Sequence, residues 1–433
     1  MKPASYQIDA SGFVYERDSS MIFARMGTGK TLCNMMAMND WLTDDAAKRI
    51  MVAAPLRVVE NVWRQEAMKW GMPFSFGIYT GKCKQIEGHN DVILVNYENL
   101  SALLDTNHGC DAIVFDELSK LRNPTGKRQK ATRRADCFKI RTGSTGTPTP
   151  NGLMSVYGMC QAVGLGHLVG KSFDKWKRQF FYPTDFKGHD WVAFKHTELE
   201  LAKLLKPYTY ILEDDAVELP PIVRPPIHLT LPTELREVYD RMRAQSVLSD
   251  LDIVAGSAGV LRNKLRQIAS GFIYDNAGAP VKLTDWRLRV LQDIVDEQQG
   301  QPLIIAYEYR EQLAMLRQRW PDAPFLGGGS KDNDKTIERW NRRELPLLFL
   351  HPASAGHGLN IQEGGNAIAW WTLPDDRELY DQTIGRLVRR GQANSHVFSY
   401  EPVAQDTVET AVQYVLGQKD TEQKNFWNAL KSA

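Results

Sequence analysis

Short apolar runs alternate with longer amphipathic segments over the first 150 residues of the chain. Each run is nearly continuous in apolar residues, as strands of a parallel sheet are when helices cover both faces. The segments between the runs have the helical spacing of apolar positions. This alternation predicts an α/β lobe with a parallel sheet, whose strands lie at residues 21–23, 50–54, 91–95, 112–115 and 138–142.

The alternation stops after residue 152 and resumes after residue 302. Residues 153–219 are rich in aromatic side chains and predict a mainly helical insertion, and 229–275 predict a second one. The Pro-rich stretch 220–228 cannot continue a helix and is the predicted junction between the halves. The predicted fold class is therefore α/β, with two tandem parallel-sheet lobes at 1–152 and 276–433.

Composition narrows the class of protein without identifying it. The net charge is only +1, so a nucleic-acid partner would have to meet a local concentration of positive charge. No apolar run approaches the roughly 20 residues of a membrane span, and no signal peptide opens the chain. These features predict a cytoplasmic protein, or a nuclear one in a eukaryote. The five cysteines include no C-x-x-C pair, which argues against a zinc site or a disulfide framework.

A glycine-rich turn, ARMGTGKT, stands between the first predicted strand and the first predicted helix. Its glycines let successive backbone N–H groups point at phosphate oxygens, its lysine reaches the β- and γ-phosphates, and its last threonine offers a hydroxyl to Mg²⁺. The turn predicts a site for ATP and Mg²⁺, although Ala24 replaces the first glycine of the usual pattern. The candidate residues are Gly27, Thr28, Gly29, Lys30 and Thr31.

One polar residue upstream of the turn is a candidate for reading the base. Gln7 stands 23 residues before Lys30, and its amide can both donate to and accept from the edge of an adenine. Glutamine is also common on exposed surfaces, so this residue alone leaves both interpretations open.

An acidic pair follows the fourth predicted strand. Asp116 and Glu117 come directly after the apolar run 112–115, at the edge of the sheet where open α/β folds bind ligands. Asp116 is predicted to hold Mg²⁺ through water, and Glu117 to polarise the attacking water. The alternative is that the pair caps the next helix.

Positive charge is concentrated between Ser119 and Arg141, which enclose nine Lys or Arg residues and a single acid, Asp136. Such a stretch is typical of a surface that follows a nucleic-acid backbone. It is equally typical of a solvated helix face, and the sequence alone does not choose between the two.

Two further stretches have distinctive side chains. The loop 143–152 is dense in Gly, Pro and hydroxyl residues, which predicts a tight polar turn whose hydroxyl groups sense the γ-phosphate. Trp63 and Trp70 share the apolar face of a predicted helix. Core packing is the favoured interpretation of this pair, because large aromatic side chains usually serve burial.

Basic residues recur near the end of the second half. Gln382, Arg386 and Arg389 occupy positions i, i+4 and i+7 of a segment, 376–390, that is predicted to be helical, so they share one helix face. Guanidinium groups suit bidentate contact with phosphate, and arginines supplied by a second lobe stabilise the charge on a transferred phosphoryl group. Without the motifs of the first half, a solvated basic helix would be the simpler interpretation.

Together and in this order, seven stretches resemble the motifs of superfamily 2 helicase-like ATPases, and within them the Swi/Snf-type DNA translocases. The W-x-x-E that begins at Trp63 and the R-x-x-R-x-G-Q that begins at Arg386 are the most specific matches. The resemblance covers nearly the whole chain and implies two RecA-like lobes with helical insertions. It also implies hydrolysis of ATP with Mg²⁺, dependent on DNA, and movement along double-stranded DNA. The matched stretches are 6–7, 24–31, 55–66, 116–123, 145–151, 354–360 and 382–392, and 265–268 resembles a further family segment.

The resemblance also implies roles for individual residues. The catalytic residues would be Lys30, Asp116, Glu117, Arg386 and Arg389. Nucleotide contacts would come from Gln7, Gly27, Thr28, Gly29, Lys30, Thr31, Gly358 and Gln382, with Thr31 and Asp116 at Mg²⁺. Carried over by motif position, the DNA contacts would be Arg57, Tyr97, Lys120, Arg122 and Ser354.

Three departures from the family pattern bear on this interpretation. Ser119 stands where the family usually has His, which could alter the coupling between ATP and DNA. Basic residues usual near the end of the first insertion are absent from 210–213. Almost nothing lies outside the motor, so a compact bacterial or phage motor is expected. Two other functions stay open: a strand-separating helicase on DNA or RNA, and an ATP-switched nucleic-acid clamp with little turnover.

Overall fold

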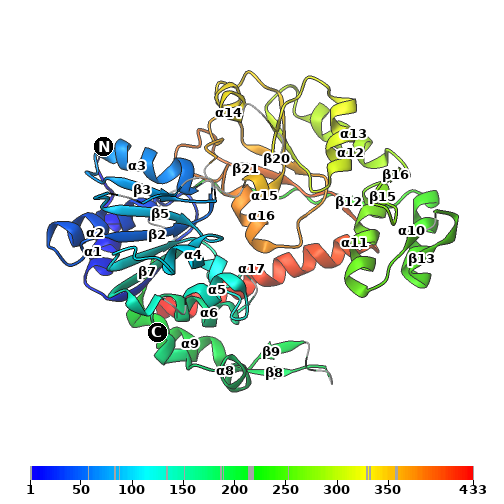
Figure 1. Cartoon of the computed structure of the whole chain (residues 1–433). Helices are drawn as coiled ribbons and strands as arrows, with labels where there is room; N and C mark the ends of the chain where they lie inside the picture. The colour runs from blue at the N-terminus through cyan, green and yellow to red at the C-terminus, as the bar shows by residue number, and fades with distance from the viewer. Residues whose placement is uncertain are drawn as a thin grey trace. The chain divides into compact units, whose positions relative to one another are not determined.

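The computed structural model describes residues 2–432 except 57, 82–83, 87, 133–134, 151, 186–187, 189, 213–218, 252, 328–329, 331–332 and 356–358. The chain divides into two compact units (Figure 1). The first consists of Met1–Glu218 with Lys419–Ala433, and the second of Leu219–Gln418. None of the helices in the described part of the chain has the length and apolar character needed to cross a membrane.

The first unit is built on a parallel sheet whose central strands are buried at nearly every residue. The strands are β1 (Ser19–Phe23), β2 (Ile50–Ala54), β3 (Phe76–Tyr79), β4 (Lys84–Gln85), β5 (Val92–Asn96), β6 (Ala112–Asp116), β7 (Ile140–Thr145) and β10 (Thr209–Ile211). Among the described residues their order is β10-β1-β7-β6-β2-β5-β3-β4, and β4 alone runs antiparallel to its neighbour. The continuous apolar runs of the sequence therefore correspond to strands that are covered on both faces.

The helices of the first unit follow the strands in alternation, as the hydrophobic pattern predicts. They are α1 (Ser5–Tyr15), α2 (Lys30–Thr43), the π-helix η1 (Val58–Val62), α3 (Trp63–Trp70), α4 (Leu100–Leu104), the 3₁₀-helix η2 (Leu118–Leu121), α5 (Lys127–Thr132) and the 3₁₀-helix η3 (Ala135–Cys137). Two helix boundaries matter for the site: α2 begins directly after the glycine-rich turn, and α3 begins directly after the π-helix.

The predicted helical insertion at 153–219 is helical over most of its length but also contains strands. Its helices are α6 (Ser155–Ala162), α7 (Gly166–Val169), α8 (Phe173–Phe180), α9 (Thr197–Leu205) and the 3₁₀-helix η4 (Lys206–Tyr208). A hairpin of β8 (Phe181–Pro183) and β9 (Trp191–Ala193) follows α8. The insertion ends in β10, which adds a parallel edge strand to the first sheet beside β1.

The second unit contains another parallel sheet. Its strands are β11 (Ile222–Val223), β17 (Leu303–Ala306), β18 (Phe325–Leu326), β19 (Leu347–Leu350), β20 (Ala367–Trp370) and β21 (Val397–Tyr400). Their order in the described chain is β11-β21-β20-β17-β19-β18, and all pairs are parallel. The predicted fold class, two tandem RecA-like parallel-sheet lobes, is confirmed. The Pro-rich stretch 220–228, predicted as a junction, lies at the start of the second unit and contains the edge strand β11.

The other elements of the second unit surround this sheet. The helices are α10 (Thr233–Gln245), the 3₁₀-helix η6 (Ser249–Leu251), α11 (Ala258–Ala269), α12 (Trp286–Glu297), α13 (Arg310–Arg319), α14 (Asn333–Asn341), α15 (Pro352–Ala355), α16 (Arg377–Ile384) and α17 (Val408–Ser432). Short strand pairs are β12 (His228–Leu229) with β22 (Val403–Ala404), β13 (Val247–Leu248) with β14 (Ile253–Val254), and β15 (Phe272–Tyr274) with β16 (Pro280–Lys282).

The C-terminal end of the chain differs from the predicted boundary. The second lobe was expected to run to Ala433, whereas Lys419–Ala433 belong to the first unit. In α17, Val412 and Leu416 lie in a core cluster of the second unit. Phe426 and its neighbours Trp427 and Leu430 instead lie in the core of the first unit. The sequence does not indicate which core receives each part of this helix.

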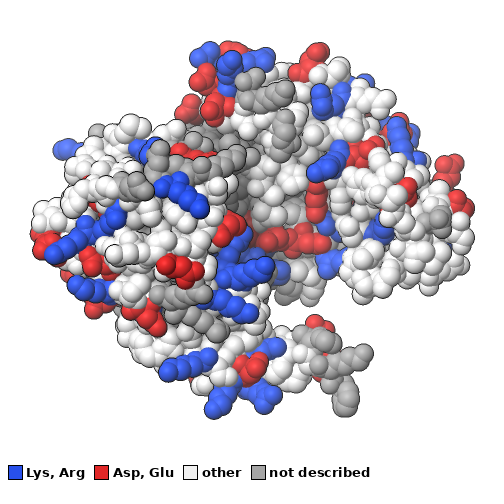
Figure 2. Space-filling view, in the orientation of Figure 1, with Lys and Arg blue, Asp and Glu red and all other residues white. Residues whose placement is uncertain are grey.

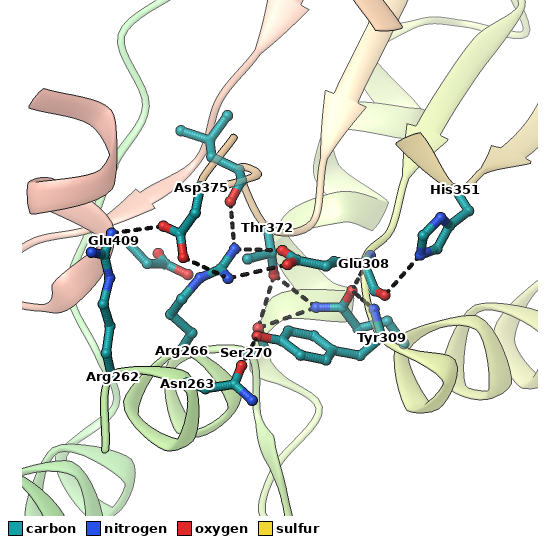
Figure 3. A network of polar contacts seen from close by, with 12 residues as sticks. Arg262, Asn263, Arg266, Ser270, Glu308, Tyr309, His351, Thr372, Asp375 and Glu409 are labelled. Atoms are coloured by element: carbon teal, nitrogen blue, oxygen red, sulfur yellow. Dashed lines mark hydrogen bonds and ion pairs between the residues drawn. The ribbon is translucent and has the colours of Figure 1, made fainter. Parts of the chain in front are cut away.

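A polar network joins α11 to the carboxyl edge of the second sheet (Figure 3). The guanidinium group of Arg266 donates to both carboxylate oxygens of Glu308, to Asp375 Oδ2 at 3.1 Å and to the carbonyl oxygen of Leu373 at 2.7 Å. Glu308 follows β17, and Asp375 follows β20. Arg266 belongs to the family-like segment 265–268, and here it ties the helical part of the unit to two loops of the sheet.

A second arginine is buried completely. Arg287 of α12 donates to both oxygens of Glu409, at 2.7 and 2.6 Å, and to the carbonyl oxygen of Pro402 at 2.8 Å. Glu409 also accepts from the backbone N–H of Ala404. This pair joins α12 to the start of α17, and neither charge has water to replace a lost partner.

We expect Glu409→Gln to lower the free energy of unfolding by about 3 kcal/mol, because it leaves the charge of Arg287 buried without a counter-charge. Denaturation by urea, followed by circular dichroism, measures this loss. The matched control is Glu344→Gln, since Glu344 forms an ion pair with Arg339 on the exposed surface. Equal stability of the two variants would contradict the structural importance assigned to the buried pair.

Candidate functional site

Three loops of the first unit leave the sheet at the same edge. β1, β7 and β6 are neighbours, with Phe23 paired to Thr145 and Asp116 paired to Ser144. Because the three strands are parallel, the glycine-rich turn, the hydroxyl-rich loop and the acidic pair all lie at their common carboxyl edge. This is the edge at which open α/β sheets bind ligands.

The glycine-rich turn has the backbone that its sequence predicts. Gly27 and Gly29 have φ angles of 79° and 82°, in the left-handed region that side chains disfavour. The hydroxyl of Thr28 donates to the carbonyl oxygen of Arg25 at 2.8 Å and closes the turn. Since α2 begins at Lys30, the N–H groups of its first turn follow directly, as in helix N-termini that bind phosphate.

Lys30 lies within this turn and against the hydroxyl-rich loop. Its Nζ donates to the carbonyl oxygens of Ala24 and Arg25, at 2.8 and 3.0 Å. A Cβ atom placed on Gly146 would lie 3.5 Å from Lys30 Nζ. The lysine and the loop after β7 are therefore in close contact, and Thr31, the next residue of α2, is partly exposed beside them.

Gln7 also lies against the glycine-rich turn. Its Nε2 donates to the carbonyl oxygen of Thr28 at 3.3 Å, and its Oε1 accepts from the backbone N–H of Ala4. The hydroxyl of Tyr6 donates to the same carbonyl oxygen of Thr28 at 3.1 Å. The structure thus brings the predicted base-reading residue to the phosphate turn, 5% exposed and held by protein groups. Its contact with adenine stays a prediction.

The carboxylates of the acidic pair have different partners. Asp116 Oδ2 accepts from the indole Nε1 of Trp63 at 2.9 Å. Glu117 Oε1 accepts from the hydroxyl of Thr145 at 2.7 Å and from that of Ser119 at 3.0 Å. Glu117 has a φ of 64° and does not cap η2 with its side chain, so the helix-capping interpretation is wrong for this residue.

The serine at position 119 is one of the hydrogen-bond partners of Glu117. The Ser119 hydroxyl and Thr145, the last residue of β7, both donate to one oxygen of Glu117. Thr145 Oγ1 in turn accepts from the backbone N–H of Thr147 at 3.1 Å. The glutamate is therefore held by hydroxyl groups from both sides, and the loop after β7 is linked to it directly.

Burial raises the pKa of Asp116 to about 6, and the adjacent charge of Glu117 adds to this effect. The hydrogen bond from Trp63 and the charge of Lys30 oppose it. A desolvated carboxylate beside a second acid favours the binding of a cation. Hard divalent cations prefer carboxylate, hydroxyl and water oxygens, and Asp116 and Thr31 offer the first two. The residues present therefore fit Mg²⁺.

The candidate residues of the second unit lie around the end of α16. Gln382 is fully buried in this helix and donates to Glu378 Oε1 at 2.9 Å. The helix ends at Ile384, with Gly385 as its C-cap. Arg386 and Arg389 follow in a turn, so the prediction that they share a helix face with Gln382 is wrong. Glycine is a poor helix former, and the chain turns there instead.

The turn nevertheless brings two predicted stretches together. Arg389 Nη1 donates to Asn360 Oδ1 at 2.6 Å and to the carbonyl oxygen of Leu359 at 3.3 Å. These partners belong to the predicted stretch 354–360. Arg386 is 8% exposed, and Ser354 is partly exposed in α15. Gly358 lies outside the described residues.

The residues of the first unit that were predicted to contact nucleic acid differ in their exposure. Tyr97 is only 3% exposed, and its hydroxyl donates to the backbone carbonyl of Asp116 at 2.8 Å. Its burial argues against direct contact with DNA and assigns it to support of the acidic pair. Lys120 and Arg122 are partly exposed near η2. Arg57 lies outside the described residues, as does Asn151 of the hydroxyl-rich loop.

Trp63 contacts a candidate site residue in a way that the sequence interpretation missed. It is fully buried, as core packing predicts, yet it also donates to the carboxylate of Asp116. An indole has one polar atom, and a buried one usually finds an acceptor. The sequence could therefore predict that a buried Trp63 has a hydrogen-bond acceptor, but not which residue supplies it.

Comparison with known proteins connects this site to a family. The SNF2-related domain matches residues 6–272. Protein p41 of Acyrthosiphon pisum secondary endosymbiont phage 1 is 31% identical over 460 residues, covering 99% of this chain and 98% of that protein. YwqA of Bacillus subtilis (strain 168), whose name proposes an ATP-dependent helicase/translocase, is 22% identical over 441 residues, covering 92% of this chain and 45% of YwqA. Among solved structures, the Sulfolobus solfataricus SWI2/SNF2 ATPase core in complex with dsDNA aligns with a TM-score of 0.46 and 21% identity, over 99% and 95% of the two chains.

We expect Gly29→Ala to weaken ATP binding by about tenfold or more, because left-handed strain of about 1–3 kcal/mol accompanies any side chain there. The new Cβ would also lie 2.2 Å from Gln7 Nε2. Isothermal titration with ATP measures the loss. Gly12→Ala in α1 is the control, since a Cβ there meets nothing within 4 Å. Unchanged affinity in the Gly29 variant would contradict the assignment of the turn.

We expect Asp116→Asn to stabilise the metal-free protein at pH 8 but not at pH 4. The pKa of Asp116 is raised to about 6. The carboxyl group is therefore protonated in the folded protein below pH 4, where it costs no stability, and it becomes a buried charge as the pH rises through 6. Allowing for partial exposure, the gain at pH 8 should be about 1–2 kcal/mol.

Thermal unfolding at several pH values, without Mg²⁺ or nucleotide, tests this. Asp9→Asn on the exposed face of α1 is the matched control. The same gain in both variants, or a gain that is independent of pH, would show that burial of the charged Asp116 carboxylate does not destabilise the protein.

Proposed function

The chain belongs to the SNF2-related family of superfamily 2 ATPases, and we propose that it is a motor that hydrolyses ATP to move along double-stranded DNA. Membership in the family makes it an ATP-dependent motor of the helicase-like type. DNA as the activating partner, and translocation as the outcome, are the proposed part. The observation that carries the proposal is the meeting of Lys30, Glu117 and the loop after β7 at one sheet edge.

The residues at this edge have the chemistry that hydrolysis of ATP requires. The turn at 27–29 and the N-terminus of α2 bind phosphate oxygens, and Lys30 leaves its backbone carbonyl partners to contact the β- and γ-phosphates. Glu117, oriented by hydroxyl groups, accepts a proton from the attacking water. Thr31, and through water Asp116, would hold Mg²⁺, which would neutralise charge on the phosphates.

The loop after β7 is suited to report the state of the γ-phosphate. Thr145 binds the carboxylate of Glu117, and Gly146 lies against Lys30. A change at either residue therefore alters the loop. Arg386 and Arg389 are the residues of the second unit proposed to stabilise the transferred phosphoryl group, because guanidinium groups suit its spread charge.

Duplex DNA is proposed as the partner on the basis of charge as well as family. In Figure 2, Lys and Arg side chains gather on the first unit over the region of α4 and α5. Lys127 and Lys130 of α5 are exposed, while Arg128 pairs with Glu98 at 2.5 Å. Contacts of lysine with phosphate carry little base information, so binding should depend on salt more than on sequence.

We expect ATP hydrolysis to be stimulated most by duplex DNA, and Lys30→Ala or Glu117→Gln to reduce it by about 100-fold or more. The rates are measured without nucleic acid and with single-stranded DNA, duplex DNA or RNA. Lys48→Ala, at an exposed position of the same unit, is the control. Displacement of the third strand of a triplex, without unwinding of the duplex, should accompany hydrolysis.

Other outcomes identify the rival functions. Stimulation confined to single strands or RNA, with strand separation on a forked substrate, would indicate a helicase. ATP binding that alters DNA affinity without turnover would indicate an ATP-switched clamp and would rule out the motor.

A further inference from the structure

We propose that Trp63 is a positioning residue that orients the Asp116 carboxylate for Mg²⁺ and couples the segment 55–70 to it. The inference rests on the proposed function, since it takes Asp116 as a magnesium-binding group. It assigns to the indole a task beyond core packing, and it makes the hydrogen bond between Trp63 and Asp116 a connection between two motifs.

The contact is specific to this site. Trp63 is fully buried, and its Nε1 donates to Asp116 Oδ2 at 2.9 Å. Trp176 and Trp427 are also buried in the first unit, but their indole nitrogens have no hydrogen-bond partner among the described residues. Burial of tryptophan in this unit therefore does not by itself produce a hydrogen bond, and the bond from Trp63 depends on where the carboxylate lies.

The Asp116 residue is fixed at two points. Its side chain is held through Oδ2 by Trp63, and its backbone carbonyl accepts from the hydroxyl of Tyr97 at 2.8 Å. Trp63 is the only side-chain donor to this carboxylate among the described residues. Groups that hold a ligand from behind set its rotamer and its basicity, so Trp63 decides the direction in which Oδ1 is presented.

The local backbone explains how Trp63 reaches this position. β2 and β6 are adjacent, with Ala53 paired to Phe115, so the segments that follow them lie at the same sheet edge. The chain after β2 forms the π-helix η1, and Trp63 begins α3 directly after it. Short π-helices are rare and commonly occur at functional sites.

The same segment is the one proposed to face nucleic acid by its family resemblance. A displacement of α3 caused by a bound backbone would therefore change the hydrogen bond to Asp116. The tryptophan at the other end of the helix lacks this connection, because Trp70 donates to Glu66 of the same helix at 3.1 Å. The two tryptophans thus form a matched pair for experiment.

The test compares Trp63→Phe with Trp70→Phe, which both keep an aromatic ring and lose the indole N–H. Binding of a fluorescent N-methylanthraniloyl ADP is measured as a function of Mg²⁺ and also in EDTA. For Trp63→Phe we expect the apparent Mg²⁺ affinity to fall by about tenfold, with the affinity in EDTA within about twofold of wild type. Trp70→Phe should follow the wild-type curve. A Mg²⁺ titration of Trp63→Phe that overlies wild type would overturn the positioning role.

Coupling has its own measurement. At saturating Mg²⁺, the ratio of hydrolysis rates with and without duplex DNA should fall at least about threefold in Trp63→Phe and stay unchanged in Trp70→Phe. If duplex DNA stimulated hydrolysis by Trp63→Phe as much as it stimulates wild type at saturating Mg²⁺, the proposed coupling would be wrong.

A measurement on the unmodified tryptophan guards against misfolding of the variant. In protein labelled with ¹⁵N-tryptophan, the indole resonance that changes in Asp116→Asn identifies Trp63. This resonance should shift when Mg²⁺ and ADP are added together, and not with ADP in EDTA. A resonance whose chemical shift does not change on addition of Mg²⁺ with ADP would contradict the inference.

Failure of the proposed function has a different signature. Wild-type protein that binds no nucleotide, or whose hydrolysis survives Lys30→Ala, would remove the function itself. Hydrolysis that depends on Lys30 and Mg²⁺, with no effect of Trp63→Phe on Mg²⁺ affinity, would remove only the role of Trp63.

Discussion

The register of three adjacent parallel strands is the constraint on which the chemistry of the first unit depends. β1, β7 and β6 pair so that Phe23 is level with Thr145, and Asp116 with Ser144. Parallel pairing places the loops after all three strands at one edge. A slip of one residue in β7 would reverse the direction of its side chains, and Thr145 would no longer face Glu117. Between β1 and β7, the hydroxyl of Ser20 also donates to Thr142 Oγ1 at 2.8 Å.

Two neighbouring acids at this edge carry an electrostatic cost that the surrounding groups offset. Glu117 receives two hydroxyl donors, and Asp116 receives one indole N–H, while burial still raises the pKa of Asp116. A cation would neutralise the negative charge that remains on the two carboxylates. Lys30 is close to the same loop, but its ammonium donates to backbone carbonyls of the glycine-rich turn. The site thus keeps charge that protein groups alone do not fully compensate.

The second unit uses its buried charges for architecture. Arg266 joins α11 to loops after β17 and β20, and Arg287 joins α12 to the start of α17. Both guanidinium groups are paired with carboxylates of the same unit, which is typical of buried ion pairs that define one arrangement of helices around a sheet. The arginines that resemble the last family motif lie elsewhere, in the turn after α16, where Arg389 contacts the stretch around Asn360.

Sequence alone determined the two parallel sheets, the glycine-rich turn and the acidic pair, because each of these depends on local patterns. Apolar runs report strand burial, and Gly27 and Gly29 report a backbone that side chains disfavour. Tertiary structure decided which distant groups meet. Trp63 and Asp116 are separated by 53 positions in the chain, and no periodicity indicates their contact. Tyr97 became a buried support of the acidic pair, and α16 ended before Arg386, because packing and a glycine overrode the helical spacing. Periodicity specifies faces and elements, whereas hydrogen bonds between elements depend on how the sheet stacks its loops.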